Sequence, residues 1–143
     1  MSAGLVTFET RMKVNERMLA GLRAANAFAC LEDRVVARLA RRAKRVVHGE
    51  GDLVIAEGEP GVGFFVVLDG DAAVSVGGEL VRALGPGDSF GELALATGRP
   101  RSASVVAATD LELVAIPAWD FRVFVAAHPC VARSLELQSF SYT

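Results

Sequence analysis

The sequence is poor in the residues that build metal centres and disulfide frameworks. Its 143 residues include two histidines, His48 and His128, which are too few for the converging ligands of a metal-dependent barrel enzyme. Cys30 and Cys130 lie far apart and form no CxxC pair, so neither a disulfide framework nor a zinc knuckle is indicated. A reducing compartment, the cytoplasm, fits this cysteine usage.

Long apolar runs and an excess of one charge sign are also absent. No apolar run is long enough to cross a bilayer, and residues 1–11 lack the apolar stretch of a signal peptide. The 15 Lys and Arg residues against 17 Asp and Glu residues give a net charge of -2, which provides no overall basic field for nucleic acid. We therefore expect one soluble domain with no membrane partner and no direct nucleic-acid binding.

The N-terminal part of the chain has helical periodicity. Between residues 14 and 40 the apolar residues recur every three or four positions, which predicts two or three amphipathic helices. Arg41, Arg42, Lys44 and Arg45 then form a basic cluster. We interpret this cluster as a solvated helix end that opposes the C-terminal dipole, in preference to an anion or nucleic-acid patch.

From residue 46 the pattern changes to short β-rich runs separated by glycine. The predicted strands are 46–48, 53–56, 64–68, 72–76, 80–84, 104–107 and 111–116. Gly77-Gly78 predicts a tight hairpin, and many short strands at near-regular spacing indicate a sandwich or closed barrel. Helical spacing returns at 119–127 and 131–140, with Pro129 breaking or restarting the helix. Trp119, Phe121 and Phe124 are interpreted as packing residues, with a ligand cleft as the alternative.

Residues 85–105 interrupt the strands and carry the functional signal. Gly85-Pro86-Gly87 predicts a turn, and a single helical turn is expected to begin near Gly91, where unpaired amide groups suit a phosphate. The planar guanidinium of Arg101 suits two phosphate oxygens. Glu92 repels a phosphate, so its place is explained if it accepts hydrogen bonds from a neutral ribose hydroxyl. The combination indicates a nucleotide; the alternative for Glu92 and Arg101 is a surface ion pair.

The segment 90–105, FGELALATGRPRSASV, resembles the phosphate-binding cassette of cyclic-nucleotide-binding domains, which occur in cAMP-dependent kinase regulatory subunits, catabolite activator proteins and cyclic-nucleotide-gated channels. Residues 57–61 and 64–70 resemble the family's glycine-punctuated strands, and the likeness covers about residues 28–140. The expected fold is mainly β: a jelly-roll-like double-stranded β-barrel with flanking N- and C-terminal helices. One domain is expected, with helices over 1–45, the barrel over 46–117 and helices over 118–143.

The resemblance implies a role for each cassette residue. Glu92 would bind the ribose 2'-hydroxyl and Arg101 the cyclic phosphate. Backbone amides would complete the cradle at Gly91, Leu93, Ser102 and Ala103. In the family a threonine directly after the arginine accompanies cGMP and alanine or serine accompanies cAMP, so Ser102 favours cAMP.

Two further positions bear on the resemblance. The family covers the base with a side chain from the last helix, for which Phe140 and Tyr142 are candidates. Val62 stands where many members carry aspartate, and we expect it to alter a loop rather than the pocket.

The expected function is an allosteric receptor of cAMP, with cGMP also open, that performs no catalysis, needs no cofactor and holds no metal. The ligand is expected to reposition the C-terminal helices, which act on an effector protein or within a homodimer. The alternatives are a domain of the same fold that has lost its ligand and serves as a dimerisation or protein-interaction module, the sensor portion of a transcription regulator, and a metal-using barrel enzyme.

Overall fold

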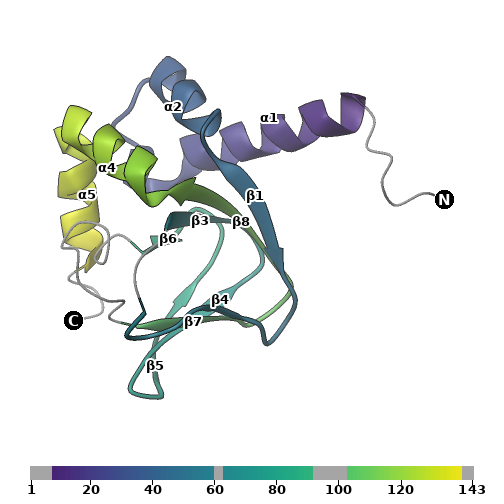
Figure 1. Cartoon of the computed structure of the whole chain (residues 1–143), viewed down its shortest axis with the longest axis vertical. Helices are drawn as coiled ribbons and strands as arrows, with labels where there is room; N and C mark the ends of the chain where they lie inside the picture. Colours follow the sequence, from purple (N-terminus) through teal and green to yellow (C-terminus); the bar gives the residue numbers. More distant parts are fainter. Residues whose placement is uncertain (1–7, 60–62, 92–102, 140–143) are drawn as a thin grey trace.

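The computed structural model describes residues 8–59, 63–91 and 103–139, in which four α-helices lie on one side of two antiparallel sheets (Figure 1). The elements in chain order are α1 (Phe8–Ala24), the 3-10 helix η1 (Asn26–Phe28), α2 (Asp33–Ala40), β1 (Lys44–His48), β2 (Leu53–Ile55), β3 (Gly63–Asp69), β4 (Ala72–Val76), β5 (Glu79–Leu84), β6 (Ser89–Phe90), β7 (Ser104–Ala107), β8 (Leu111–Pro117), α4 (Ala118–Ala127) and α5 (Pro129–Ser139). One sheet has the order β1-β8-β3-β6 and the other the order β2-β7-β4-β5. The predicted mainly β fold with flanking helices is confirmed.

The predicted strands are confirmed within one or two residues, and one strand of the described part of the chain was missed. Gly77 and Gly78 have φ angles of 59° and 85° and join β4 to β5, as the hairpin prediction requires. The missed strand is β6, whose two residues pair with Phe65 and Val66 of β3. Two residues are too few to show the alternation of apolar and polar side chains that marks a strand, so only the pairing with β3 identifies β6 as one. Pro129 restarts a helix, because a proline is tolerated in the first helical turn.

Strand β3 separates two hydrophobic clusters, because successive side chains of a strand point to opposite faces. Phe64 and Val66 belong to the cluster beneath the helices. Val67 belongs to the cluster between the two sheets, and the partly buried Phe65 packs against that cluster. Both faces of this sheet are therefore covered along β3, which explains why its sequence is a nearly continuous apolar run rather than an alternating one.

Aromatic contacts attach the helices to β3. Phe121 of α4 stacks on Phe64 at a centroid distance of 4.4 Å, and Phe28 of η1 meets Phe64 edge-on at 5.9 Å and Phe124 at 6.0 Å. The packing interpretation is thus confirmed for Phe121 and Phe124. It is wrong for Trp119, whose side chain is 73% exposed.

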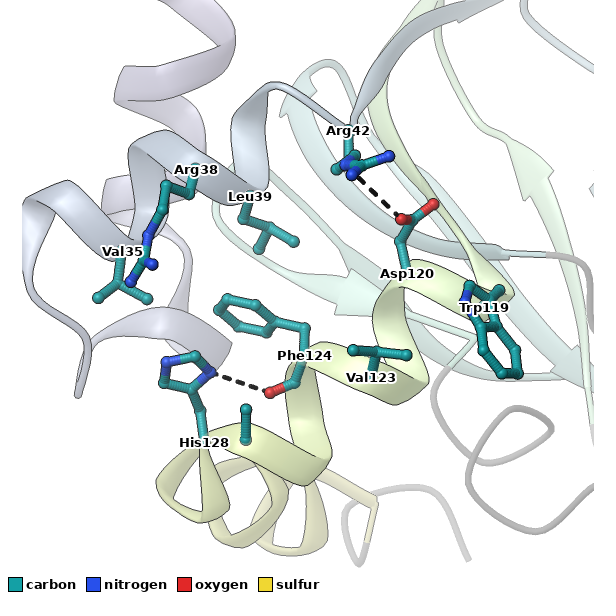
Figure 2. Close-up of a pocket in the computed structure, with 10 residues that line it drawn as sticks. Val35, Arg38, Leu39, Arg42, Trp119, Asp120, Val123, Phe124 and His128 are labelled. Carbon is teal, nitrogen blue, oxygen red and sulfur yellow. Dashed lines mark hydrogen bonds and ion pairs between the residues drawn. The ribbon is translucent and has the colours of Figure 1, made fainter.

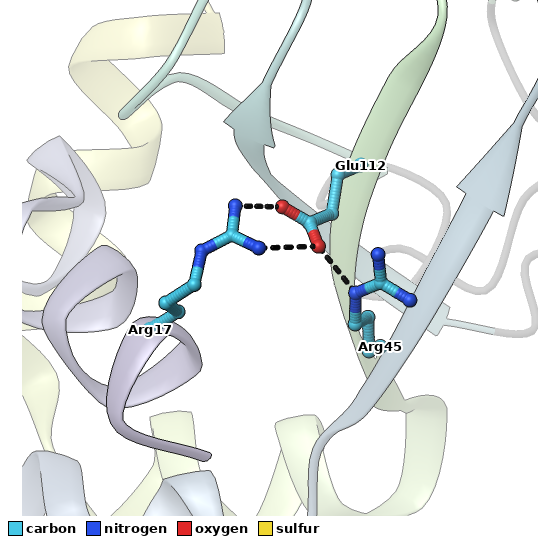
Figure 3. Close-up of polar contacts among 3 residues, drawn as sticks. All are labelled: Arg17, Arg45 and Glu112. Atoms are coloured by element: carbon cyan, nitrogen blue, oxygen red, sulfur yellow. Dashed lines mark hydrogen bonds and ion pairs between the residues drawn. The ribbon is translucent and has the colours of Figure 1, made fainter. Parts of the chain in front are cut away.

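A charged cluster attaches α1 to the strands (Figure 3). Glu112 of β8 is 7% exposed and forms ion pairs with Arg17 of α1 and Arg45 of β1. Arg42 lies within 3.9 Å of Asp120, so two members of the predicted basic cluster have intramolecular partners. The single-helix-end interpretation is wrong for Lys44 and Arg45, because both lie in β1.

Replacing Glu112 by glutamine is expected to destabilise the fold by about 1–3 kcal/mol. The change keeps the shape of the side chain but removes the negative charge that pairs with Arg17 and Arg45. Urea unfolding measures the loss, and Glu16→Gln, at an exposed site on α1, is the control. Equal stability of both variants would show that the cluster contributes nothing.

Gly70 and Gly51 form a matched pair for a second stability test. Both have positive φ angles, 86° and 88°, so alanine is strained at either site. A Cβ on Gly70 meets the carbonyl oxygen of Asp110 at 2.1 Å, whereas one on Gly51 meets nothing within 4 Å. We expect Gly51→Ala to cost about 1–2 kcal/mol and Gly70→Ala clearly more in urea unfolding, the difference measuring the clash.

Candidate functional site

The chain between β6 and β7 passes from one sheet to the other. β6 belongs to the sheet with β3, and β7 belongs to the sheet with β4. Both ends of this crossing are anchored in the cluster between the sheets, where Phe90 is 2% exposed, Ala103 8% and Val105 1%. The predicted cassette therefore spans the two sheets from fixed points.

Gly91 begins the crossing with a φ of 99°, a conformation that glycine adopts without a steric penalty. The preceding residue, Phe90, stacks on Phe65 at 5.1 Å with nearly parallel rings. A strand residue and a ring stack thus fix the direction from which the chain enters the cassette.

The turn before the cassette is held by β3 and by η1. Val67 donates its backbone N–H to Asp88 O at 2.9 Å, and Gly87 donates to Val67 O at 3.0 Å. From the helical side, Asn26 donates its backbone N–H to Gly87 O at 3.1 Å and its side-chain Nδ2–H to Asp88 Oδ1 at 3.3 Å. The predicted turn at 85–87 is confirmed, and its contact with η1 was not predicted.

The structure describes two of the six predicted site residues. Gly91 and Ala103 stand at the two ends of the crossing, close to β6 and β7. Four lie outside the described residues: Glu92, Leu93, Arg101 and Ser102. The helical turn expected to follow Gly91, together with Val62, Phe140 and Tyr142, also lies outside them.

A separate hollow of about 520 Å³ lies between α2 and α4 (Figure 2). Leu39 and Phe124 line it, together with Arg38 of α2 and Arg42 of the turn that follows α2. Trp119 lies at its edge, so the alternative of a cleft lined by this residue describes its position better than packing on the barrel does. The hollow lies on the helical side of β3, opposite the cluster that anchors the cassette.

Cys30 and Cys130 form a disulfide, which contradicts the expectation drawn from their distance along the chain. Cys30 follows η1 and Cys130 is the second residue of α5, and their Cα atoms are 6.3 Å apart. The expectation failed because a separation of 100 residues in sequence does not determine a separation in space. The bond also removes the argument for a reducing compartment that rested on unpaired cysteines.

Within residues 8–59, 63–91 and 103–139, no group of three or more His, Cys, Asp and Glu side chains is arranged to hold a metal ion. In the same ranges no helix combines the length and apolar character needed to cross a membrane.

Comparisons with known proteins give a consistent result. The family model described as "Cyclic nucleotide-binding domain" matches residues 45–128. A cyclic nucleotide-gated potassium channel from Mesorhizobium japonicum is 34% identical over 109 residues, which are 76% of this chain and 30% of the channel. The chain thus spans less than a third of that relative.

Two solved structures extend the comparison. PKAR CBD2 with bound Sp-2Cl-cAMPS is 26% identical with a TM-score of 0.78, covering 91% of this chain and 90% of that one. The N-terminal domain of a transcriptional regulator from Streptomyces coelicolor is 30% identical with a TM-score of 0.67, covering 80% and 86%.

Proposed function

Because this chain belongs to the cyclic nucleotide-binding domain family, we propose that it is a regulatory sensor that binds cAMP, in preference to cGMP, through residues 90–105. The observation that carries the proposal is the crossing between the sheets, with both ends buried and a positive-φ glycine at its start. Because both ends of the segment are already held, less of the chain has to be ordered when the segment binds one anion.

The proposal assigns the contacts as the family resemblance implies them. Arg101 binds the cyclic phosphate and Glu92 accepts a hydrogen bond from the ribose 2'-hydroxyl. Amides complete the cradle at Gly91, Leu93, Ser102 and Ala103. Ser102 directly after Arg101 supports cAMP, and so does the similar PKAR domain that holds Sp-2Cl-cAMPS.

The proposed signal travels to the C-terminal helices through β3. Phe65 contacts Phe90 at the cassette, and its neighbour Phe64 contacts Phe121 of α4 on the other face. A movement of Phe90 on ligand binding therefore acts on the strand that supports α4. The expected output is a change in how α4 and α5 pack, which requires that the ligand bind one arrangement better than the other.

Calorimetry with cAMP and cGMP is the direct test of binding. We expect heat with both nucleotides and a lower dissociation constant for cAMP; 5'-AMP, which lacks the cyclic phosphate, is the control. A thermal-shift assay supports it, since ligand at about 100 times its dissociation constant stabilises the fold by roughly 2.7 kcal/mol. Absence of heat at millimolar cAMP and cGMP would contradict the proposal and favour a domain that has lost its ligand.

Helix movement has its own reporter in Trp119, the only tryptophan of the sequence. It is exposed on α4, so a movement of α4 is expected to change its emission. A cAMP-dependent change that disappears in Trp119→Phe supports the movement. Binding heat without any change in emission would contradict it.

For the effector, we propose only the kind of protein on which the sensor acts. Similarity to the regulator domain from Streptomyces coelicolor favours, as a second candidate, the sensor portion of a transcription regulator. Similarity to the Mesorhizobium channel favours attachment to a larger protein in general.

We also propose a cytoplasmic location, where a disulfide is transient and redox-sensing more often than structural.

A further inference from the structure

The Cys30–Cys130 bond connects the turn before the cassette to the last described helix through a short segment. Asn26 is hydrogen-bonded to Gly87 and Asp88 of that turn, and Cys30 follows Asn26 by four positions along the chain. Cys130 then carries the connection into α5. The disulfide therefore lies between the proposed binding segment and the helix proposed to move.

The bond is accessible to a small reagent. Cys30 is exposed and Cys130 is partly exposed, and both line a hollow of about 410 Å³ at the surface. The charged and titratable side chains that line the same hollow are Glu32, Arg34, His128 and Arg133. Glu32 is neutralised by Arg34 at 3.0 Å, which leaves the positive charge of Arg133 to attract an anion.

We propose that Cys30 and Cys130 form a reversible redox site that reacts with an anionic low-molecular-weight disulfide, such as oxidised glutathione, and that its disulfide form weakens cyclic-nucleotide binding by holding α5 against η1. The second half of this proposal rests on the proposed function. The first half rests on the accessible cysteine pair alone.

The reaction is a two-step thiol–disulfide exchange. The more exposed Cys30, as a thiolate, attacks one sulfur of oxidised glutathione, which forms a mixed disulfide and releases one glutathione thiolate. The Cys130 thiolate then attacks Sγ of Cys30 and releases the second glutathione. Two protein thiols lose two electrons to one glutathione disulfide, and the two protons that they release are taken up by the two glutathione thiolates, which become thiols.

The effect on binding follows from linkage. In the disulfide form the first turn of α5 is covalently tied to Cys30, two residues after the end of η1. In the dithiol form this tie is absent, and α5 still packs on the cluster beneath the helices through the buried residues Val131 and Leu135. If cAMP binds better when α5 is displaced, a bond that opposes this displacement must lower the affinity for cAMP. By linkage, bound cAMP lowers the equilibrium constant for closing the bond by the same factor.

Thiol counting tests the redox half without any nucleotide. The full chain is equilibrated in glutathione buffers of graded ratio and trapped with iodoacetamide for mass spectrometry. We expect a reversible conversion between two free thiols and none, and in Cys130→Ser a mixed disulfide with glutathione. A bond that stays closed in a reducing buffer of cytosolic ratio, or thiols that stay free in oxidised glutathione, would overturn the proposal.

Calorimetry with cAMP tests the coupling on the oxidised and reduced wild-type protein, so that no variant has to fold. We expect the reduced form to bind at least about fivefold more tightly. Cys30→Ser, which cannot close the bond, is expected to bind equally with and without reductant. Equal affinities of both wild-type forms would overturn the coupling. No binding in any form would refute the proposed function, and thiol counting would still decide the redox site.

Discussion

Replacement of Arg101 by alanine is expected to weaken cAMP binding by roughly 30-fold to several thousand-fold. In the proposed site Arg101 is the charged partner of the cyclic phosphate, and truncating one partner of a desolvated charge pair costs about 2–5 kcal/mol. Calorimetry at constant ionic strength measures it.

Two variants make this result specific. Glu92→Ala is expected to weaken binding less, because its contact is with a neutral hydroxyl. Arg41→Ala removes an equal charge from an exposed site at the end of α2 and is expected to leave affinity unchanged. If Arg101→Ala bound cAMP as well as Arg41→Ala did, the phosphate site would lie elsewhere.

The strands of the barrel could be predicted because their signals are local. β4 and β5 are joined by Gly77-Gly78, and a two-residue turn with two positive φ angles fixes the hairpin from sequence alone. β3 was found as an apolar run between glycines, although its division between two clusters required the structure. The cassette likewise has a local motif, and the structure adds the burial of its ends.

The contacts that were missed join distant parts of the chain. Cys30 and Cys130, Asn26 and Asp88, and Arg17 and Glu112 carry no local mark that pairs them. The exposed position of Trp119 was missed for a different reason. Helix α4, AWDFRVFVAA, is apolar on most sides, so its periodicity does not identify the buried face. Which distant residues pair, and which face of a helix is buried, depend on the tertiary structure, whereas turns and strands have sequence signals of their own.

Opening the Cys30–Cys130 bond is expected to lower the free energy of unfolding by about 2–5 kcal/mol. The bond links residues 100 positions apart, and in the chain-entropy model a closed loop of that length restricts the unfolded chain by about 4.7 kcal/mol. The loop includes all of the strands, so every unfolded conformation is restricted by it. Urea unfolding with and without a phosphine reductant measures the difference.

The variant Cys30→Ser/Cys130→Ser separates the bond from the reductant. Its stability is expected to equal that of the reduced wild-type protein and to be independent of reductant, since serine keeps the size of the side chain but forms no bond. Equal stability of oxidised and reduced wild-type protein would contradict this prediction. The same measurement bears on the redox site. The disulfide stabilises the folded state by a certain free energy, and folding makes disulfide formation more favourable by that same amount. If the glutathione pool opens the bond, opening it must lower the free energy of unfolding by an amount near the lower end of this range.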